Sequence, residues 1–245
     1  MSAEALAGRI AAELRAAGTA ERAISEKAYL KSDLDFYGVT VRVTRRIVRD
    51  ALKQEPDFDR AALLALVETL WKEPVHEQRM AAYEALDFRG ALLEAADMAL
   101  VERLLRESKT WALVNGLAEH VAGCLVQRFP QLNATLDRWA VDPDFWLRRA
   151  ALLALLTPLR RGAGDFARFA RYADALLEER EFFIRKAIGW VLRETAKKRP
   201  ELVFAWLAPR TQRASGVTLR EAVKYLPAPQ RDLLLAAYRA KRPAG

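Results

Sequence analysis

The sequence predicts an all-α protein, built as an α-solenoid of stacked helix pairs with a curved, concave surface. Apolar residues recur with a helical period of about 3.6 in nearly every window, and there is little of the alternation typical of strands. The chain has only 11 glycines and 10 prolines, most of which lie between the periodic blocks. Helix pairs recur about every 35–45 residues, which is the range of HEAT repeats.

The predicted helices are bounded by glycine and proline residues, because these two residue types interrupt helices. Their connections are short, so successive helices are expected to pack antiparallel as neighbours. No linker rich in Pro, Gly or Ser divides the chain, so the sequence predicts one domain over residues 1–245. The predicted helices cover residues 2–17, 20–32, 40–54, 58–72, 75–86, 89–107, 109–128, 131–140, 143–157, 165–178, 182–198, 200–208, 217–226 and 228–241.

Composition favours an acidic partner. Lys and Arg number 40 against 32 Asp and Glu, which gives a net charge of +8, and nucleic acid is the commonest partner of such proteins. The single cysteine, Cys124, excludes an internal disulfide, and His76 and His120 are too far apart for a zinc motif, so neither a metal site nor a cofactor is predicted. The absence of a signal-peptide pattern and of an apolar run of about 18 residues is typical of a cytoplasmic protein. We expect a monomer that does not bind membranes.

The segment EFFIRKAIGWVLRETAKKRP, residues 181–200, places a tryptophan outside its apolar face. On a helix, Ile184, Ile188 and Val191 point to the core. Trp190 instead falls on one stripe with Lys186, Arg193 and Lys197. Either Trp190 covers a neighbouring helix while the cations are solvated, or the stripe is an aromatic group in a cationic track that suits a polyanion with flat bases.

Two further segments carry clustered arginine or lysine. In VRVTRRIVRD, four arginines fall within an arc of about 100°, and only Asp50 is placed to balance them. They form either a solvated face or a phosphate-binding face, since the guanidinium group matches phosphate geometry. In SGVTLREAVKYL, Arg220 and Lys224 form a basic pair four residues apart, for which a solvated face is the stronger interpretation. The four arginines are Arg42, Arg45, Arg46 and Arg49.

Arg149 and Asn115 are polar residues in apolar surroundings. Arg149 falls inside the apolar face of PDFWLRRAALLALL, so it forms either a buried salt bridge or a contact with phosphate. In SKTWALVNGLAEHVAG, Trp111 and Asn115 are four residues apart and lie on one line beside the core. Asparagine is a mediocre helix former, so Asn115 is expected to have a hydrogen-bonding role, either between helices or at a site.

Through these segments, the sequence resembles the AlkD family, which comprises HEAT-like-repeat alkylpurine DNA glycosylases and related DNA alkylation repair proteins. The resemblance extends from about Tyr29 to Leu226 and is most specific in EFFIRKAIGWVLRETAKKRPELV. It is also carried by YLKSDLDFYGVTVRVTRR, LWKEPVHEQRMAAYEAL, SKTWALVN, DFWLRRAALLALL and LREAVKYL. It implies a C-shaped stack of repeats that holds duplex DNA in a concave basic groove. It further implies hydrolysis of the N-glycosidic bond of cationic N3- and N7-alkylated purines without base flipping.

The resemblance also assigns roles to single residues. It implies that Trp111 and Trp190 contact the lesion nucleotide and that Tyr29 and Arg149 contact DNA. The family's catalytic aspartate falls on Asn115, whose amide can hold a water molecule but cannot act as a base. General-base catalysis is worth roughly 10² to 10⁴ in rate, so the activity is expected to be attenuated unless another acid, such as Glu119, substitutes.

Three functions are compatible with this sequence. The first is a glycosylase for alkylated purines in double-stranded DNA, and the second is a relative that binds DNA without glycosylase activity. The third is a protein-binding scaffold whose basic faces are incidental. Steep dependence of DNA affinity on salt separates the first two from the third, and base release separates the first from the second.

Overall fold

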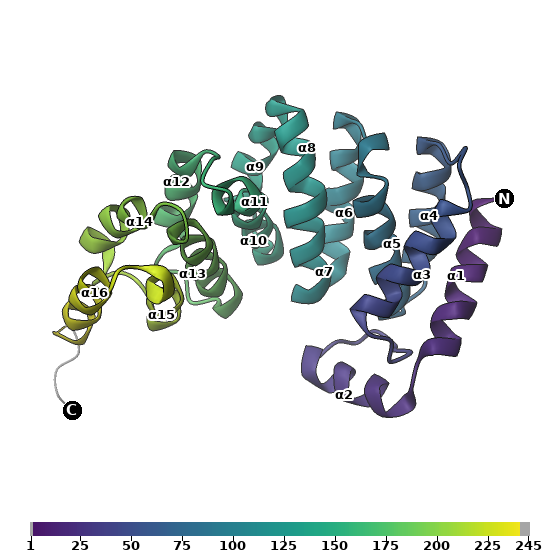
Figure 1. Cartoon of the computed structure of the whole chain (residues 1–245), viewed down its shortest axis with the longest axis horizontal. Helices are drawn as coiled ribbons and strands as arrows, with labels where there is room; N and C mark the ends of the chain where they lie inside the picture. Colours follow the sequence, from purple (N-terminus) through teal and green to yellow (C-terminus); the bar gives the residue numbers. More distant parts are fainter. Residues whose placement is uncertain (1, 241–245) are drawn as a thin grey trace. The chain divides into compact units, whose positions relative to one another are not determined.

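The computed structural model describes residues 2–240, and these residues form an all-α structure (Figure 1). Within that range the only β pairing is an isolated bridge between Asp35 and Val75. No helix in the described range has the length and apolar character that crossing a membrane requires. The all-α prediction is therefore confirmed. The chain divides into two compact units, Met1–Leu117 and Ala118–Gly245, whereas the single domain, the C shape and the concave groove stay predictions.

The N-terminal unit is built from two rows of helices. α1, α3, α5 and α7 contact one another in succession, while α4 packs on α1 and α5, and α6 packs on α7 (Figure 1). Its elements are α1 (Ala3–Ala17), α2 (Ala20–Leu30), α3 (Val41–Lys53), α4 (Arg60–Lys72), α5 (His76–Phe88), the 3₁₀ turns Gly90–Leu92 and Ala95–Asp97, α6 (Met98–Ser108) and α7 (Trp111–Gly116).

The C-terminal unit is organised around α13. This helix packs on α10, α11, α14 and α15, and α10 in turn packs on α9 and α12 (Figure 1). Its elements are the π-helical segment up to Ala122, α8 (Gly123–Arg128), the 3₁₀ turn Pro130–Leu132, α9 (Asn133–Trp139), α10 (Phe145–Leu153), α11 (Leu156–Arg160), α12 (Phe166–Leu176), α13 (Phe182–Ala196), α14 (Pro200–Leu207), the 3₁₀ turn Ala208–Arg210, α15 (Gly216–Ala222), the 3₁₀ turn Val223–Tyr225 and α16 (Ala228–Ala240).

Seven of the described α-helices begin where a small polar side chain accepts a backbone N–H of the first turn. Such a cap satisfies one of the donors that the start of a helix leaves unpaired. Thr40 caps α3 by accepting from Val43, and Asp144 caps α10 by accepting from Trp146. Both helices carry site residues near their first turns, so these caps help to fix where those residues lie. The same role is taken by Ser2, Thr19, Asp59, Asp165 and Ser215.

Two predicted helices are wrong because they are interrupted. The predicted helix 89–107 is two 3₁₀ turns followed by α6, and Asp97 accepts the backbone N–H of Glu94 at 2.7 Å in a capping box that starts the helix anew. The predicted helix 143–157 breaks after Leu153. Pro158 explains the break, since it has no N–H for the carbonyl of Ala154 and its ring crowds that carbonyl.

The predicted helix 109–128 is continuous but not uniform. It begins at Trp111 and widens into a π-helix over Leu117–Ala122 before α8. π-helical insertions are rare and often occur at functional sites. Glu119, which the sequence analysis considered as a substitute acid, lies within this π-helical segment.

Candidate functional site

The α3 arginines divide into two classes. Arg45 Nε lies 2.8 Å from Glu84 Oε2, and the Glu84 side chain is fully buried. Arg49 lies 3.9 Å from Asp87, so both acids come from α5. The expectation that Asp50 alone balances this face is therefore wrong, because Asp50 pairs with Lys53 at 3.6 Å and two acids of α5 pair with half the cluster.

Arg42 and Arg46 form the other class. Both side chains are exposed, and neither has an acidic partner among the residues that the structure describes. With Val43 between them they line a hollow of about 470 Å³. Two guanidinium groups one helical turn apart beside an open hollow provide donors for phosphate oxygens.

Tyr29 and Trp111 come together from distant parts of the N-terminal unit. Tyr29, near the end of α2, is 72% exposed. Its ring meets that of Trp111 edge to face, with centroids 6.0 Å apart and an interplanar angle of 88°. Trp111 is the first residue of α7, and Asn115 lies one turn later; both are half-buried. The structure thus places three of the predicted site residues on α2 and α7, with the ring of Trp111 against that of Tyr29.

Gly116 allows α7 to lie close to α5. A Cβ atom at Gly116 would fall 2.5 Å from Cζ of Tyr83, which is far inside van der Waals contact. Any larger side chain would push the Tyr83 ring away. The glycine that follows Asn115 therefore fixes the depth at which Asn115 sits.

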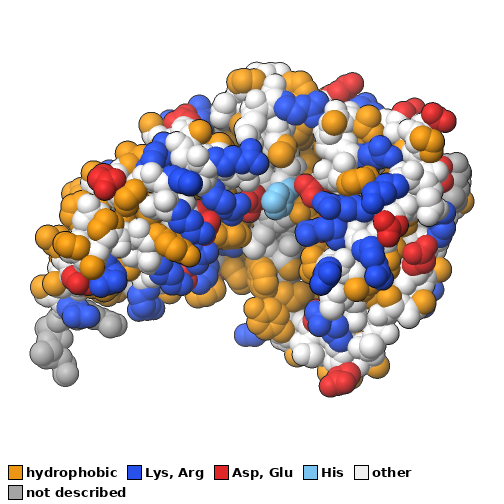
Figure 2. Space-filling view, viewed as in Figure 1, with side chains coloured by type: hydrophobic (Ala, Val, Ile, Leu, Met, Phe, Trp, Pro, Cys, Tyr) orange, Lys and Arg blue, Asp and Glu red, His pale blue; other side chains and the backbone are white. Residues whose placement is uncertain are grey.

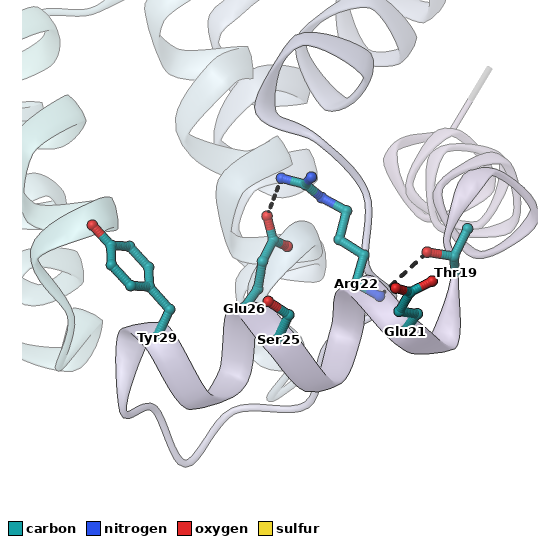
Figure 3. Close-up of a pocket in the computed structure, with 6 residues that line it drawn as sticks. All are labelled: Thr19, Glu21, Arg22, Ser25, Glu26 and Tyr29. Atoms are coloured by element: carbon teal, nitrogen blue, oxygen red, sulfur yellow. Dashed lines mark hydrogen bonds and ion pairs between the residues drawn. The ribbon is translucent and has the colours of Figure 1, made fainter.

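A second hollow, of about 440 Å³, lies against α2 (Figure 3). Tyr29 and Arg22 contribute to its lining, together with the carboxylates of Glu21 and Glu26. Figure 3 shows that Arg22 reaches toward Glu26, with which it forms an ion pair. Two carboxylates and a neutralised arginine are poor surroundings for a phosphate, so this hollow does not extend the basic surface.

The predicted core face of α13 is buried. Ile184, Ile188 and Val191 have no exposed surface, and Trp190 is half-buried outside that face. Lys186 and Arg193 share the stripe as the sequence predicts, but they are not simply solvated. Both bind a carboxylate of α15, which the sequence analysis did not identify.

That carboxylate belongs to Glu221, which is the centre of an ion cluster. Its Oε1 accepts from Lys186 Nζ at 2.7 Å and from Lys224 Nζ at 2.9 Å, while its Oε2 accepts from Arg193 Nη1. Burial raises the pKa of Glu221, but the hydrogen bonds from Lys186 and Lys224 outweigh it and bring the pKa to about 2. Glu221 is consequently ionised at neutral pH.

Gly189 explains how Glu221 reaches α13. A Cβ at Gly189 would lie 2.7 Å from Cβ of Glu221 and 2.9 Å from the backbone oxygen of Thr218. The residue before Trp190 must therefore be glycine for α15 to approach this closely. The pair Gly189–Trp190 in the sequence could have indicated a close helix contact. Only the packing shows that the glycine faces α15.

Glu194 forms a second ion cluster on α13. Its carboxylate accepts from Lys197 Nζ at 2.8 Å, from Arg160 Nε at 3.0 Å and from Arg193 Nε at 3.2 Å. Arg160 also binds Glu119, which accepts from Thr157 Oγ1 at 3.1 Å. Burial raises the pKa of Glu194, and its cationic partners lower it by more. Glu119 is buried and committed to this cluster, so the suggestion that it substitutes for a missing catalytic acid receives no support from its contacts.

Arg149 is buried, as the apolar pattern around it implies, and one of its hydrogen bonds goes to a backbone carbonyl of α13. Only 3% of the residue is exposed, its guanidinium lies 5.8 Å from the centre of the Phe183 ring, and it donates to the Phe183 carbonyl oxygen. Burial lowers the pKa of Arg149 to about 10. This placement joins α10 to the start of α13, and the predicted contact of Arg149 with DNA stays a prediction.

Tyr225 is a further candidate site residue, which the sequence analysis missed. It is 52% exposed, and Lys197 Nζ lies 4.8 Å from the centre of its ring. Its neighbours Lys224 and Arg220 are exposed as well. The adjacent pair Lys224–Tyr225 could have drawn attention to it, because exposed aromatic rings beside cations are typical of nucleic-acid surfaces.

Figure 2 shows where the cationic side chains gather within each unit. Lys and Arg cover the face of α3 in the N-terminal unit, and they cover the visible faces of α13 and α15 in the C-terminal unit. Acidic side chains are also visible among them (Figure 2). Glu84 and Glu221 lie beneath their arginine and lysine partners. The charges that face outward at these two places are therefore mainly positive.

Comparisons with known proteins agree on one family. A profile of the family described as DNA alkylation repair enzyme matches residues 10–226. The fold is similar to that of a predicted DNA alkylation repair enzyme from Enterococcus faecalis, with 22% identity, a TM-score of 0.74 and coverage of 86% of this chain and 97% of that chain. It is also similar to AlkD2 from Streptococcus mutans, with 18% identity, a TM-score of 0.60 and coverage of 77% and 91%. No curated protein matches the sequence.

Proposed function

Because the chain belongs to the DNA alkylation repair enzyme family, we propose that it binds double-stranded DNA and removes cationic N3- and N7-alkylated purines from it. The reaction is hydrolysis of the N-glycosidic bond without base flipping, at a rate lowered by Asn115. The protein acts as a monomer on the DNA of a bacterial cytoplasm.

The observation that carries the proposal is the surface of α13. Trp190 shares its helix face with Lys186 and Arg193, and those two cations and Lys224 surround the carboxylate of Glu221. The surplus of positive charge suits phosphate, while a half-buried indole beside it suits a sugar or a cationic base. In the N-terminal unit, Trp111 and the unpaired Arg42 and Arg46 offer the same two kinds of contact.

The reaction requires little catalytic assistance from the protein, because the alkylated base is a good leaving group. An N3- or N7-alkylated purine carries a positive charge, and when the bond from N9 to C1′ breaks, the base takes the bonding pair and leaves neutral. Positive charge then develops on the sugar, where the face of an indole such as Trp190 can stabilise it. A water molecule adds to C1′ and releases its proton to solvent, which leaves an abasic site.

Asn115 supports a second candidate function. Its amide can hold water by hydrogen bonds, but it supplies neither negative charge nor a base. The half-buried position of Asn115, one turn from Trp111, would suit a water molecule near the sugar. A protein that binds damaged DNA without hydrolysing it would keep every other feature of this surface.

Two measurements test the proposal. We expect duplex DNA containing 7-methylguanine to release base faster with the protein than without it. We also expect the logarithm of the binding constant to fall steeply with the logarithm of salt concentration, by about 0.9 for each phosphate contacted. Binding with no excess release would leave the second candidate, and weak binding that does not depend on salt would eliminate both.

Replacement of Trp190 by alanine is expected to reduce base release while leaving the fold intact. An aromatic contact with a nucleotide is worth roughly 1–3 kcal/mol, so the loss should be about 5- to 150-fold. Single-turnover rates and a melting curve measure the two effects separately. If the variant unfolds at ordinary temperature, Trp190 is a structural residue and the assignment is wrong.

A further inference from the structure

The Glu221 cluster has a geometry that a structural salt bridge does not require. The Glu221 side chain is 9% exposed, whereas its partners Lys186 and Lys224 are 41% and 49% exposed. The carboxylate therefore lies beneath its cations, which stand between it and solvent. They come from two different elements, Lys186 and Arg193 from α13 and Lys224 from the 3₁₀ turn that follows α15.

The donors of these cations exceed what Glu221 can accept. An ammonium group has three N–H donors and a guanidinium has five. Each lysine uses one of them on Glu221 Oε1, and Arg193 uses Nη1 on Oε2 and Nε on Glu194. Arg193 joins this cluster to that of Glu194, and the connected network holds five cations and three carboxylates, a local charge of about +2. The lysine donors on its outer side suit two neighbouring phosphates of a DNA strand.

Glu221 is unsuited to act as a base itself. Burial raises its pKa, but the bonds from Lys186 and Lys224 lower it to about 2, so it does not take up a proton at neutral pH. Its effect on a ligand must therefore pass through the cations that it holds.

We propose that Glu221 is a positioning residue that holds Lys186, Arg193 and Lys224 as a preformed binding site for two adjacent DNA phosphates. The inference rests on the proposed function, since it concerns how that surface engages DNA. Long cationic side chains lose rotamer freedom when they bind. Because Glu221 restricts them in the free protein, part of that loss has already occurred before DNA arrives.

Glu221→Gln separates positioning from simple charge. The substitution raises the net charge by one, so charge alone predicts tighter binding to DNA. Positioning predicts the opposite, a loss of roughly tenfold, because the three cations are no longer fixed and must be immobilised when DNA binds. The probe is an unmodified duplex at fixed salt. Unchanged or tighter binding by a folded variant would overturn the proposal.

Glu178→Gln is the matched control. Glu178 is exposed and lies 3.6 Å from Arg213, so its substitution makes the same charge change outside the cluster. We expect this variant to bind DNA as tightly as the wild type or slightly more so. If Glu178→Gln and Glu221→Gln weaken binding equally, Glu221 has no positioning role.

A second pair of variants covers the case in which Glu221→Gln does not fold. Lys224→Gln should weaken binding roughly tenfold, and Lys198→Gln, an exposed lysine outside the cluster, should weaken it by much less. Equal losses would overturn the proposal.

A double variant tests the coupling between Glu221 and Lys224. In folded Glu221→Gln protein, adding Lys224→Gln should reduce DNA affinity far less than it does in the wild type; additive losses would contradict positioning. Absence of DNA binding by the wild type would refute the proposed function itself.

Discussion

Asn115→Asp is expected to raise the rate of base release from 7-methylguanine duplex by roughly 10² to 10⁴, the usual contribution of a general base. The carboxylate would orient and deprotonate the attacking water and stabilise positive charge on the sugar. Asn and Asp have the same shape, so Trp111 and Gly116 should keep their places. Single-turnover release of base, corrected for spontaneous loss, measures the gain.

Asn133→Asp provides the control, since it makes the same change of charge and shape. Asn133 begins α9 in the other unit, where its Nδ2 donates to the Pro130 carbonyl oxygen. We expect no gain in base release from this variant. If Asn115→Asp gives none either while still binding DNA, Asn115 does not occupy the position of the missing carboxylate.

The double variant Arg42→Gln/Arg46→Gln is expected to lose about two orders of magnitude or more in DNA affinity. A hydrogen bond to a charged group is worth about 1.5–3 kcal/mol, and both exposed arginines lie beside the same hollow. The slope of log affinity against log salt should fall by about 1.8, or 0.9 for each lost phosphate contact. A titration at several salt concentrations gives both quantities.

The control for this variant removes two arginines that already have acidic partners. Arg171 binds Asp137, and Arg213 lies 3.9 Å from Asp174. Arg171→Gln/Arg213→Gln changes the net charge by the same amount, but it should leave the salt slope within experimental error. If both double variants lower the slope alike, general charge attracts DNA and the hollow at Arg42 and Arg46 has no special role.

The site could be predicted from the sequence only where a helical face defines it. The angular positions along α13 put Trp190 off the core, and the structure agrees because the core face is buried as expected. The same angular analysis grouped four arginines on α3. It could not identify their acidic partners Glu84 and Asp87, because these lie on another helix. A partner acid 39 residues away in sequence leaves no trace in local periodicity.

The sequence by itself determined the helical class, most helix boundaries and which side of each helix is apolar, because these depend on local period, caps and the residues that break helices. It did not determine which cations are neutralised. In the sequence, Glu221 is one acid within a basic segment. In the structure, the close packing at Gly189 places it beneath Lys186 and Arg193. Only the tertiary structure decided this, because the energy of a charge depends on its neighbours in space and on its burial, and helix packing sets both.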